Sequence, residues 1–185
     1  MSFIGKLIRP LRAGDKKLAI LDPAFDELPR LDVRSEAFEN GGPMGPPYVD
    51  ASGDFPPLHW SVVPEGTRSL ALVVQDIDVP LPAPLVHAVA FGIAADASGL
   101  PARALPRAGS AQVPAPNLSL GRGFAGEAYG PPTPIPGHGP HRYVYQVFAL
   151  DYVPAFDAAP NEHELLSAIR GHVLACGEVI GTHEA

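Results

Sequence analysis

The sequence predicts a mainly β protein with a C-terminal α-helix and long loops rich in proline and glycine. The 185 residues include 23 prolines and 19 glycines, a content that disfavours long helices. Hydrophobic residues make up 46% of the chain, which is enough for a sizeable core and more than disordered chains contain. Three apolar runs are also rich in the β-branched and aromatic residues that favour strands.

Residues 1–20 are predicted to form a basic, amphipathic arm. A short helix is expected over residues 3–11, limited by Pro10, because apolar residues recur there at helical spacing. These apolar residues are Phe3, Ile4, Leu7, Ile8 and Leu11. We expect the arm to dock on the rest of the chain or on a second copy in a homodimer. Attachment to a membrane surface is the less favoured alternative, since it needs more length or a second signal.

Residues 21–185 are predicted to form one domain. Prolines and glycines divide its first part, residues 21–68, into short strands joined by turns. The clearest strands are predicted at residues 69–75, 85–93 and 142–150, and their nearly continuous apolar character predicts a central sheet buried on both faces. Between the last two strands, residues 101–140 are rich in proline and contain no convincing strand, which indicates a functional or strained loop.

The C-terminal region is predicted to be helical from Asn161 to Val179. Asn161 is a good N-cap, and Glu164 three residues later completes a capping box. Apolar residues follow at helical spacing, and Gly181 is suited to end the helix. The apolar residues are Leu165, Ile169 and Val173.

Charge and cysteine content exclude several classes of function. The net charge is −7, and residues 1–20 carry five basic side chains against Asp15, so the rest of the chain is more acidic still. An acidic body is unsuited to neutralising phosphates, so no nucleic-acid partner is expected. The single cysteine, Cys176, cannot form an intrachain disulfide. Because no uninterrupted apolar segment suits a signal peptide or a membrane span, we expect a cytoplasmic protein without membrane association.

Common catalytic and nucleotide-binding motifs are absent or lack their context. Residues 121–126 match G-x-G-x-x-G, but the prolines after Tyr129 prevent the helix that a dinucleotide-binding loop requires. There is no G-x-S-x-G elbow, no phosphate-binding P-loop and no H-E-x-x-H zinc motif. We therefore predict that the protein is not an enzyme and binds no cofactor or metal.

The candidate site consists of polar residues near the ends of the three predicted strands. Asp76 and Asp78 end the first strand, His87 lies in the second, and His141 begins the third. In an extended chain Asp76 and Asp78 share a face, whereas His141 and Arg142 point to opposite sides. We expect His141 in the site and Arg142 behind it, paired with a carboxylate. A carboxylate bound to one imidazole nitrogen fixes the tautomer and leaves the other nitrogen for a ligand.

Proline-rich segments on both sides are predicted to brace this site. The runs at residues 79–84 and 131–136 restrict the backbone, and Pro80, Gly137 and Arg142 are the expected bracing residues. Imidazoles together with backbone N–H groups next to glycine can receive a phosphate-like anion. Each element also has an ordinary structural explanation, such as turn formation by the Asp-x-Asp pair. His59 and His172 are interpreted as structural, and for the His138-x-x-His141 pair loop structure is favoured over metal ligation.

Two signatures occur in order, D-x-D-x-P at residues 76–80 and G-x-x-x-H-R-Y at residues 137–143. With the segment Pro-Pro-Leu-His-Trp at residues 56–60, they resemble the phosphatidylethanolamine-binding protein family in its bacterial, Raf-kinase-inhibitor-like branch. The resemblance implies a β-sandwich around a large antiparallel sheet. It also implies a small anion-accepting pocket at Asp76, Asp78, His87 and His141. The family usually has proline at the position of Ile77 and an aromatic residue at that of Ala88, so the shape of the pocket is expected to differ.

These observations favour a regulatory protein that binds a small anion, such as phosphate or a phosphoethanolamine-like headgroup. One alternative is an interaction or inhibitor protein that acts through its surface on a protein partner that the sequence does not identify. The other is a weak hydrolase in which a His–Asp pair activates water.

Overall fold

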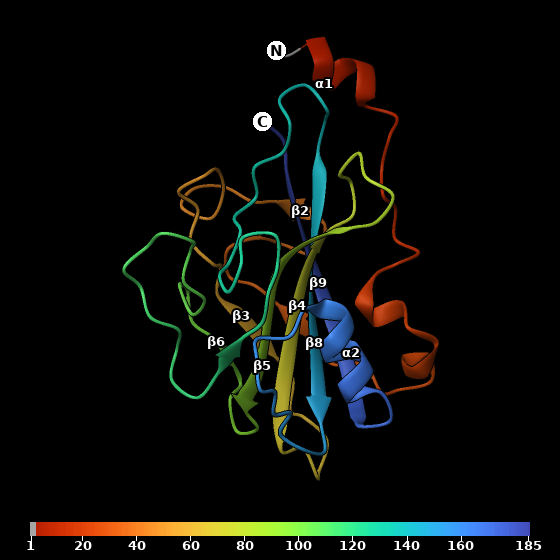
Figure 1. Ribbon diagram of the computed structural model, residues 1–185, viewed down its shortest axis with the longest axis vertical. Coiled ribbons are helices and arrows are strands. Elements are labelled where there is room, and N and C mark those ends of the chain that lie inside the picture. Colours follow the sequence, from red (N-terminus) through yellow and green to blue (C-terminus); the bar gives the residue numbers. More distant parts are fainter. Residues whose placement is uncertain (1–2) are drawn as a thin grey trace.

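The computed structural model describes residues 3–185 and contains two β-sheets (Figure 1). In order across the larger sheet, the strands are β2 (Gly42–Pro43), β9 (Val173–His183), β8 (His141–Leu150), β4 (Ser69–Asp76), β5 (Leu85–Ala94) and β7 (Ser119–Leu120). The smaller sheet consists of β1 (Val33–Arg34), β3 (Leu58–Trp60) and β6 (Gly99–Leu100). The mainly β prediction is confirmed. The larger sheet is mixed rather than purely antiparallel, because β2 pairs in parallel with β9.

The three clearest predicted strands are confirmed as β4, β5 and β8, each to within one residue at its ends. All eight residues of β4 are buried, so the centre of the large sheet is covered on both faces as predicted. One face packs in a cluster that includes Phe55 and Tyr145, with the smaller sheet. The opposite face packs against α2 (Glu162–Ile169) and the short 3-10 turns η1 (Ala19–Leu21) and η2 (Pro23–Phe25). Figure 1 shows these two coverings on opposite sides of the long strands.

The prediction of one helix from Asn161 to Val179 is wrong in its second half. The capping box is confirmed, because the Asn161 side chain accepts from Glu164 N at 3.0 Å and the Glu164 carboxylate accepts from Asn161 N at 2.7 Å. However, α2 ends at Ile169, and Gly171 has a φ of +80° that turns the chain. The following residues form β9, which pairs with β8 along its length. This pairing outweighs the helical spacing of the apolar residues.

Two buried glutamines attach the N-terminal segment to the large sheet. Gln146 of β8 donates from Nε2 to Oε1 of Gln75 in β4 at 2.8 Å. Backbone N–H groups of η1 donate to both side chains, Ala19 to Gln75 Oε1 at 2.9 Å and Ile20 to Gln146 Oε1 at 2.8 Å. The pair therefore satisfies backbone donors that would otherwise be buried without a partner.

Gln75 also donates from Nε2 to the carboxylate of Glu162 at 2.9 Å, and burial raises the pKa of Glu162 to about 7. A raised carboxyl pKa contributes stability at low pH that is lost as the pH rises through the folded value. We expect Glu162→Gln to stabilise the protein by about 1 to 2 kcal/mol at pH 8, less than the full pKa shift implies because the side chain is only partly buried.

Urea unfolding at pH 4.5 and pH 8 measures this effect, with the exposed Glu127→Gln as the control. The gain should be present at pH 8 and small at pH 4.5. An equal gain at both pH values would contradict the explanation by ionisation.

The N-terminal arm contains α1 (Phe3–Ile8), which ends three residues before the predicted limit of 11 and just before Pro10. Its segment docks on the same chain, since Ala13 N and Gly14 N donate to Val79 O and Ile77 O at 2.9 and 2.8 Å. Among residues 3–185, no helix is long and apolar enough to cross a membrane.

Candidate functional site

A cavity of about 270 Å³ lies where β4, β5 and β8 meet the proline-rich loops. Its polar residues are almost completely buried: Asp76, His87, His141 and Tyr143. Its other lining residues are mostly apolar: Val79, Pro80, Leu81, Leu85, Phe124, Thr133, Pro134 and Ile135. Three of these apolar side chains, Leu81, Phe124 and Ile135, are more than a third exposed. The cavity therefore has a buried polar floor and an apolar rim that reaches solvent.

Strand pairing brings the predicted residues of β4 and β8 together. Asp76, at the end of β4, is the register partner of Tyr143 in β8, two residues after His141. His141 and Asp76 share a hydrogen bond of 2.7 Å between Nδ1 and Oδ2. The prediction that a carboxylate binds His141 is therefore confirmed, but the prediction that the other ring nitrogen faces a ligand is wrong, because Nε2 lies 2.7 Å from Nδ1 of His138. The other oxygen of Asp76 accepts from the backbone N of Asp78 at 2.8 Å, so both carboxylate oxygens are occupied.

Asp78 does not line the cavity, contrary to the expectation that it shares a face with Asp76. The backbone bends at Ile77, and strand alternation ends there. Arg142 donates to both carboxylate oxygens of Asp78, from Nε at 2.7 Å and from Nη2 at 2.8 Å. Nη1 of Arg12, in the arm, lies 3.0 Å from Oδ1 of Asp78. Burial alone would raise the pKa of Asp78, but the hydrogen bonds from Arg142 and Arg12 hold it below its ordinary value. The predicted pairing of Arg142 with a carboxylate behind the site is confirmed.

His87 presents an unpartnered nitrogen to the cavity. Its Nδ1 lies 2.6 Å from Gly130 O and must donate, because a carbonyl oxygen can only accept. Burial lowers the pKa of His87, so the imidazole is neutral and its Nε2 carries a lone pair. Within the part of the chain that the structure describes, Nε2 has no hydrogen-bond partner.

Tyr143 also places an unpartnered group in the cavity, and the sequence analysis missed it. Its hydroxyl is buried beside the Asp76 carboxylate, but no contact with the described residues has the geometry of a hydrogen bond. Burial and the nearby Asp76 carboxylate raise the pKa of Tyr143, so the hydroxyl remains protonated and can donate. Tyr143 lies two positions after His141 in β8, so strand alternation alone could have placed it on the same face.

His138 has a larger role than the structural one predicted for it. It is fully buried, and its Nδ1 lies 2.7 Å from Nε2 of His141. Its Nε2 lies 3.0 Å from Ile8 O and 3.1 Å from Leu11 O of the arm. His138 therefore joins the arm to His141. The other predicted bracing residues lie beside these groups: Pro80 on the cavity rim, and Gly137, with a φ of +83°, in the turn before His138.

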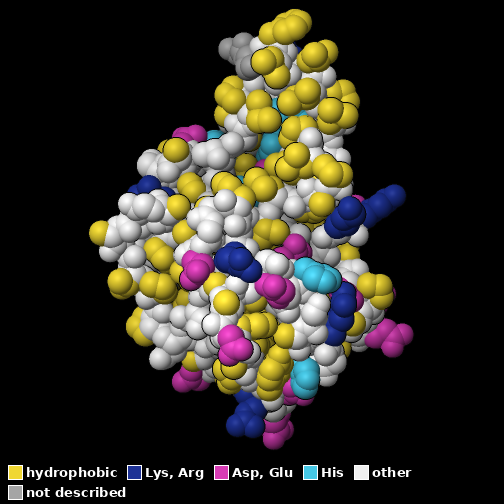
Figure 2. Space-filling view, in the orientation of Figure 1, with side chains coloured by type: hydrophobic (Ala, Val, Ile, Leu, Met, Phe, Trp, Pro, Cys, Tyr) yellow, Lys and Arg dark blue, Asp and Glu magenta, His cyan; other side chains and the backbone are white. Residues whose placement is uncertain are grey.

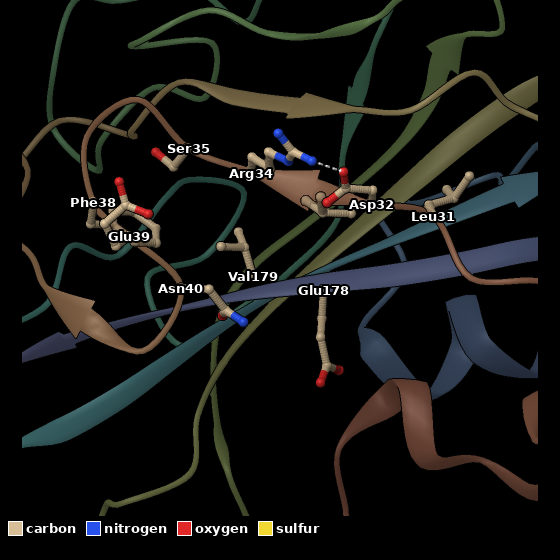
Figure 3. A pocket seen from close by; sticks show the side chains of 10 residues that line it. Leu31, Asp32, Arg34, Ser35, Phe38, Glu39, Asn40, Glu178 and Val179 are labelled. Carbon is tan, nitrogen blue, oxygen red and sulfur yellow. Dashed lines mark hydrogen bonds and ion pairs between the residues drawn. The ribbon is translucent and has the colours of Figure 1, made fainter.

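A second cavity, of about 460 Å³, lies between β1 and β9 (Figure 3). It is lined by Leu31, Asp32, Val33, Arg34, Ser35, Phe38, Glu39, Asn40, Glu178 and Val179. Asp32 and Arg34 pair with each other, and Glu178 points away from them (Figure 3). None of the unpartnered buried polar atoms found in residues 3–185 belongs to this cavity. The same residues include no group of three His, Cys, Asp or Glu side chains suited to hold a metal ion. The cavity at His87 and Tyr143 is therefore the candidate site.

Comparison with known proteins gives a consistent result. The family model for phosphatidylethanolamine-binding protein matches residues 34–184. A UPF0098 protein of Chlamydia muridarum is 34% identical over 160 residues, which covers 83% of this chain and 99% of the relative. A UPF0098 protein of Methanothermobacter thermautotrophicus is 32% identical over 157 residues, with 83% and 98% covered.

Solved structures are also similar. A phosphatidylethanolamine-binding protein homologue from Chlamydia trachomatis superposes with a TM-score of 0.72 at 31% identity, covering 84% of this chain and 98% of that one. Escherichia coli YbcL, described as a member of the mammalian PEBP family, has a TM-score of 0.74 at 27% identity, with 84% and 99% covered. Residues 34–184, which the family model matches, include the D-x-D-x-P and G-x-x-x-H-R-Y signatures and the four buried polar residues of the cavity. This chain belongs to the phosphatidylethanolamine-binding protein family.

Proposed function

We propose that the protein binds a small phosphate-bearing molecule in the cavity, either inorganic phosphate or a phosphate monoester such as phosphoethanolamine. The observation that carries this proposal is the pair of buried, unpartnered polar atoms that the cavity contains, Nε2 of His87 and the hydroxyl of Tyr143. Buried polar groups normally have partners, so two orphans in one cavity point to a ligand.

The two atoms have complementary requirements. Neutral His87 accepts a hydrogen bond at Nε2, whereas the Tyr143 hydroxyl can donate one. A hydrogen phosphate group offers a P–OH donor and P–O acceptors within one tetrahedron, and so satisfies both. The Asp76 carboxylate nearby disfavours the fully ionised dianion. The ligand is therefore proposed to bind with one proton shared between the phosphate and His87.

The proposed activity is binding of the ligand, with a regulatory role for the protein, and not chemical conversion of the ligand. Apart from Tyr143, the described lining residues contain one hydroxyl group that could act as a nucleophile, that of Thr133. This hydroxyl donates to Pro131 O at 3.4 Å and not to a base that would activate it. The apolar rim supports a ligand whose phosphate enters first while its organic part stays near solvent. The names of the matching family model and of the Chlamydia trachomatis structure, which refer to phosphatidylethanolamine binding, are in line with such a headgroup.

Calorimetric titration with inorganic phosphate, phosphoethanolamine and ethanolamine tests the proposal. Both phosphate compounds should bind to wild type, whereas ethanolamine should not. Tyr143→Phe removes one hydroxyl and should weaken binding about tenfold, as expected for a hydrogen bond to a charged group.

Tyr129→Phe is the matched control, since the Tyr129 hydroxyl is also buried but bonds to Tyr145 at 3.0 Å, and Tyr129 does not line the cavity. It should leave phosphate affinity unchanged. Absence of phosphate binding, or equal affinities in wild type and Tyr143→Phe, would refute the proposal. Binding of ethanolamine alone would indicate a cation site instead.

A further inference from the structure

We propose that His138 couples docking of the N-terminal arm, residues 3–14, to the ligand cavity. In this proposal, the docked arm takes up one proton and, through His138, withholds Nε2 of His141 from a ligand. The arm is thus an internal competitor of the ligand. The statement about the ligand rests on the proposed function, whereas the statement about the proton does not.

The arm is held mainly by polar contacts. His138 and the backbone pairs at Ala13 and Gly14 account for several of them, and Arg12 donates to Pro140 O at 2.9 Å. At α1, Gly5 packs so closely that an added Cβ would lie 2.1 Å from Pro136 O. Four of the large apolar side chains of the arm are between 57% and 81% exposed, Phe3, Ile4, Leu7 and Leu11, whereas Ile8 is partly buried. Figure 2 shows apolar side chains gathered at this protruding end. Because docking buries little apolar surface, it depends on few interactions, and a change in one of them shifts the equilibrium between the docked and the undocked arm.

Docking depends on pH because the contacts that hold the arm need one more hydrogen than the neutral imidazoles supply. Three short contacts run in series from Asp76 to His141, from His141 to His138, and from His138 to the arm carbonyls. Each contact needs one hydrogen on one of its two atoms. Two neutral imidazoles supply two hydrogens and an ionised Asp76 supplies none. The docked arrangement therefore contains one more proton, which gives the chain one imidazolium balanced by the Asp76 carboxylate.

Loss of that proton breaks one of the three contacts. If His138 keeps its hydrogen on Nε2 for the arm, two lone pairs face each other between His138 and His141. If it moves the hydrogen to Nδ1, a lone pair faces Ile8 O and Leu11 O, and the arm is released. The nearest charged groups cannot take over the role of this proton, because Arg12 and Arg142 are already paired with Asp78. The other titratable or charged groups around the two histidines are Arg9, His87, Tyr143 and His183, the last paired with Asp50.

The same contact limits the ligand. His141 lines the cavity, yet its Nδ1 is bound to Asp76 and its Nε2 to His138. A phosphate group can form a hydrogen bond with Nε2 of His141 only after His138 withdraws. Arm docking and this third ligand contact are therefore mutually exclusive, and each weakens the other by the same factor.

Hydrogen exchange of the full chain, followed by NMR between pH 6 and pH 9, tests the proton coupling. Protection factors of the Ala13 and Gly14 amides report docking, and that of the core residue Val147 reports the fold. In wild type, arm protection should fall by up to tenfold per pH unit once the shared proton titrates, while Val147 protection changes little. In His138→Gln the glutamine amide can still donate a hydrogen bond but cannot gain or lose a proton. The protection factors of Ala13 and Gly14 in this variant should therefore change with pH no more than that of Val147.

His172→Gln is the control, because His172 lies on the exposed surface, where it contacts Asp151, and takes no part in the contacts that run from Asp76 to the arm. It should keep the wild-type pH dependence. Arm protection that is independent of pH in wild type, or equally dependent on pH in His138→Gln, would overturn the proton coupling. If His138→Gln reduces Val147 protection, ¹⁵N shifts of the wild-type histidine rings decide instead. Two neutral rings at pH 6 would overturn the proposal.

Gly5→Val tests the competition, because it pushes α1 from Pro136 and leaves the histidines intact. Arm protection at pH 6 should fall at least fivefold without a change at Val147, and phosphate should bind at least threefold more tightly than to wild type. Unchanged or weaker phosphate binding with reduced arm protection would overturn the competition. If phosphate binds to neither protein, the proposed function and the competition fail together, while the pH dependence of arm protection still decides the proton coupling.

Discussion

Asp78→Asn is expected to destabilise the fold by about 2 to 4 kcal/mol, slightly less than the loss typical of a broken, fully buried ion pair. Asp78 is 1% exposed and binds two guanidinium groups and a backbone N–H. The asparagine side chain has the same shape but carries no charge, and its amide nitrogen cannot accept. Arg12 and Arg142 both reach solvent, which keeps the loss below that of a pair enclosed on all sides.

The pH dependence of this loss identifies its cause. A carboxyl group whose pKa is lower in the folded protein contributes stability above its ordinary pKa, and this contribution disappears as the pH falls through the folded value. The difference between wild type and Asp78→Asn should therefore be largest near pH 6 and shrink below about pH 4. Urea unfolding at pH 6 and at pH 3 measures both values.

Asp32→Asn provides the matched control for Asp78→Asn. It also removes the carboxylate from an Asp–Arg pair, with Arg34, but both side chains are more than half exposed. It is expected to leave the free energy of unfolding nearly unchanged, because exposed ion pairs contribute little. Equal costs at the two positions would mean that the burial of Asp78 has no energetic importance.

The sequence was sufficient to predict the features that depend on local pattern. The apolar runs of β4, β5 and β8 are long and rich in β-branched residues, so their positions were predictable to one residue. Because these strands are neighbours, the polar residues at their ends had to lie close together. The contact between Asp76 and His141 follows from that arrangement.

Features that depend on distant pairing could not be predicted. Residues 173–179 continue the apolar spacing of α2, and only the available edge of β8 makes them a strand. Asp78 was expected beside Asp76, but Arg142 and Arg12 hold it on the other side of the bent backbone. The contact of His138 with Ile8 spans 130 residues, and no local pattern indicates it.

The basic arm has a more specific role in the structure than its charge indicates. Charge alone separated a basic arm from an acidic domain and left open what the arm binds. In the structure, Arg12 is a counter-ion of buried Asp78, and the carbonyl groups of residues 8 and 11 receive His138. Polar contacts of Arg12 and of backbone groups of the arm thus connect it to the segments from which the site residues come, while Phe3, Ile4 and Leu7 of α1 stay exposed.

Gln146→Leu is expected to destabilise the protein by about 2 to 4 kcal/mol, because it leaves buried polar groups without partners. Leucine has a similar size but cannot accept from Ile20 N or donate to Gln75 Oε1, and Gln146 is completely buried. Thermal or urea unfolding measures the loss, and reduced exchange protection of the Ile20 amide locates it at η1. Ser167→Leu on the exposed side of α2 adds the same side chain where no buried bond is lost, and should change stability by about 0.5 kcal/mol or less. A Gln146→Leu protein as stable as wild type would show that the 3-10 turn is held by apolar packing alone.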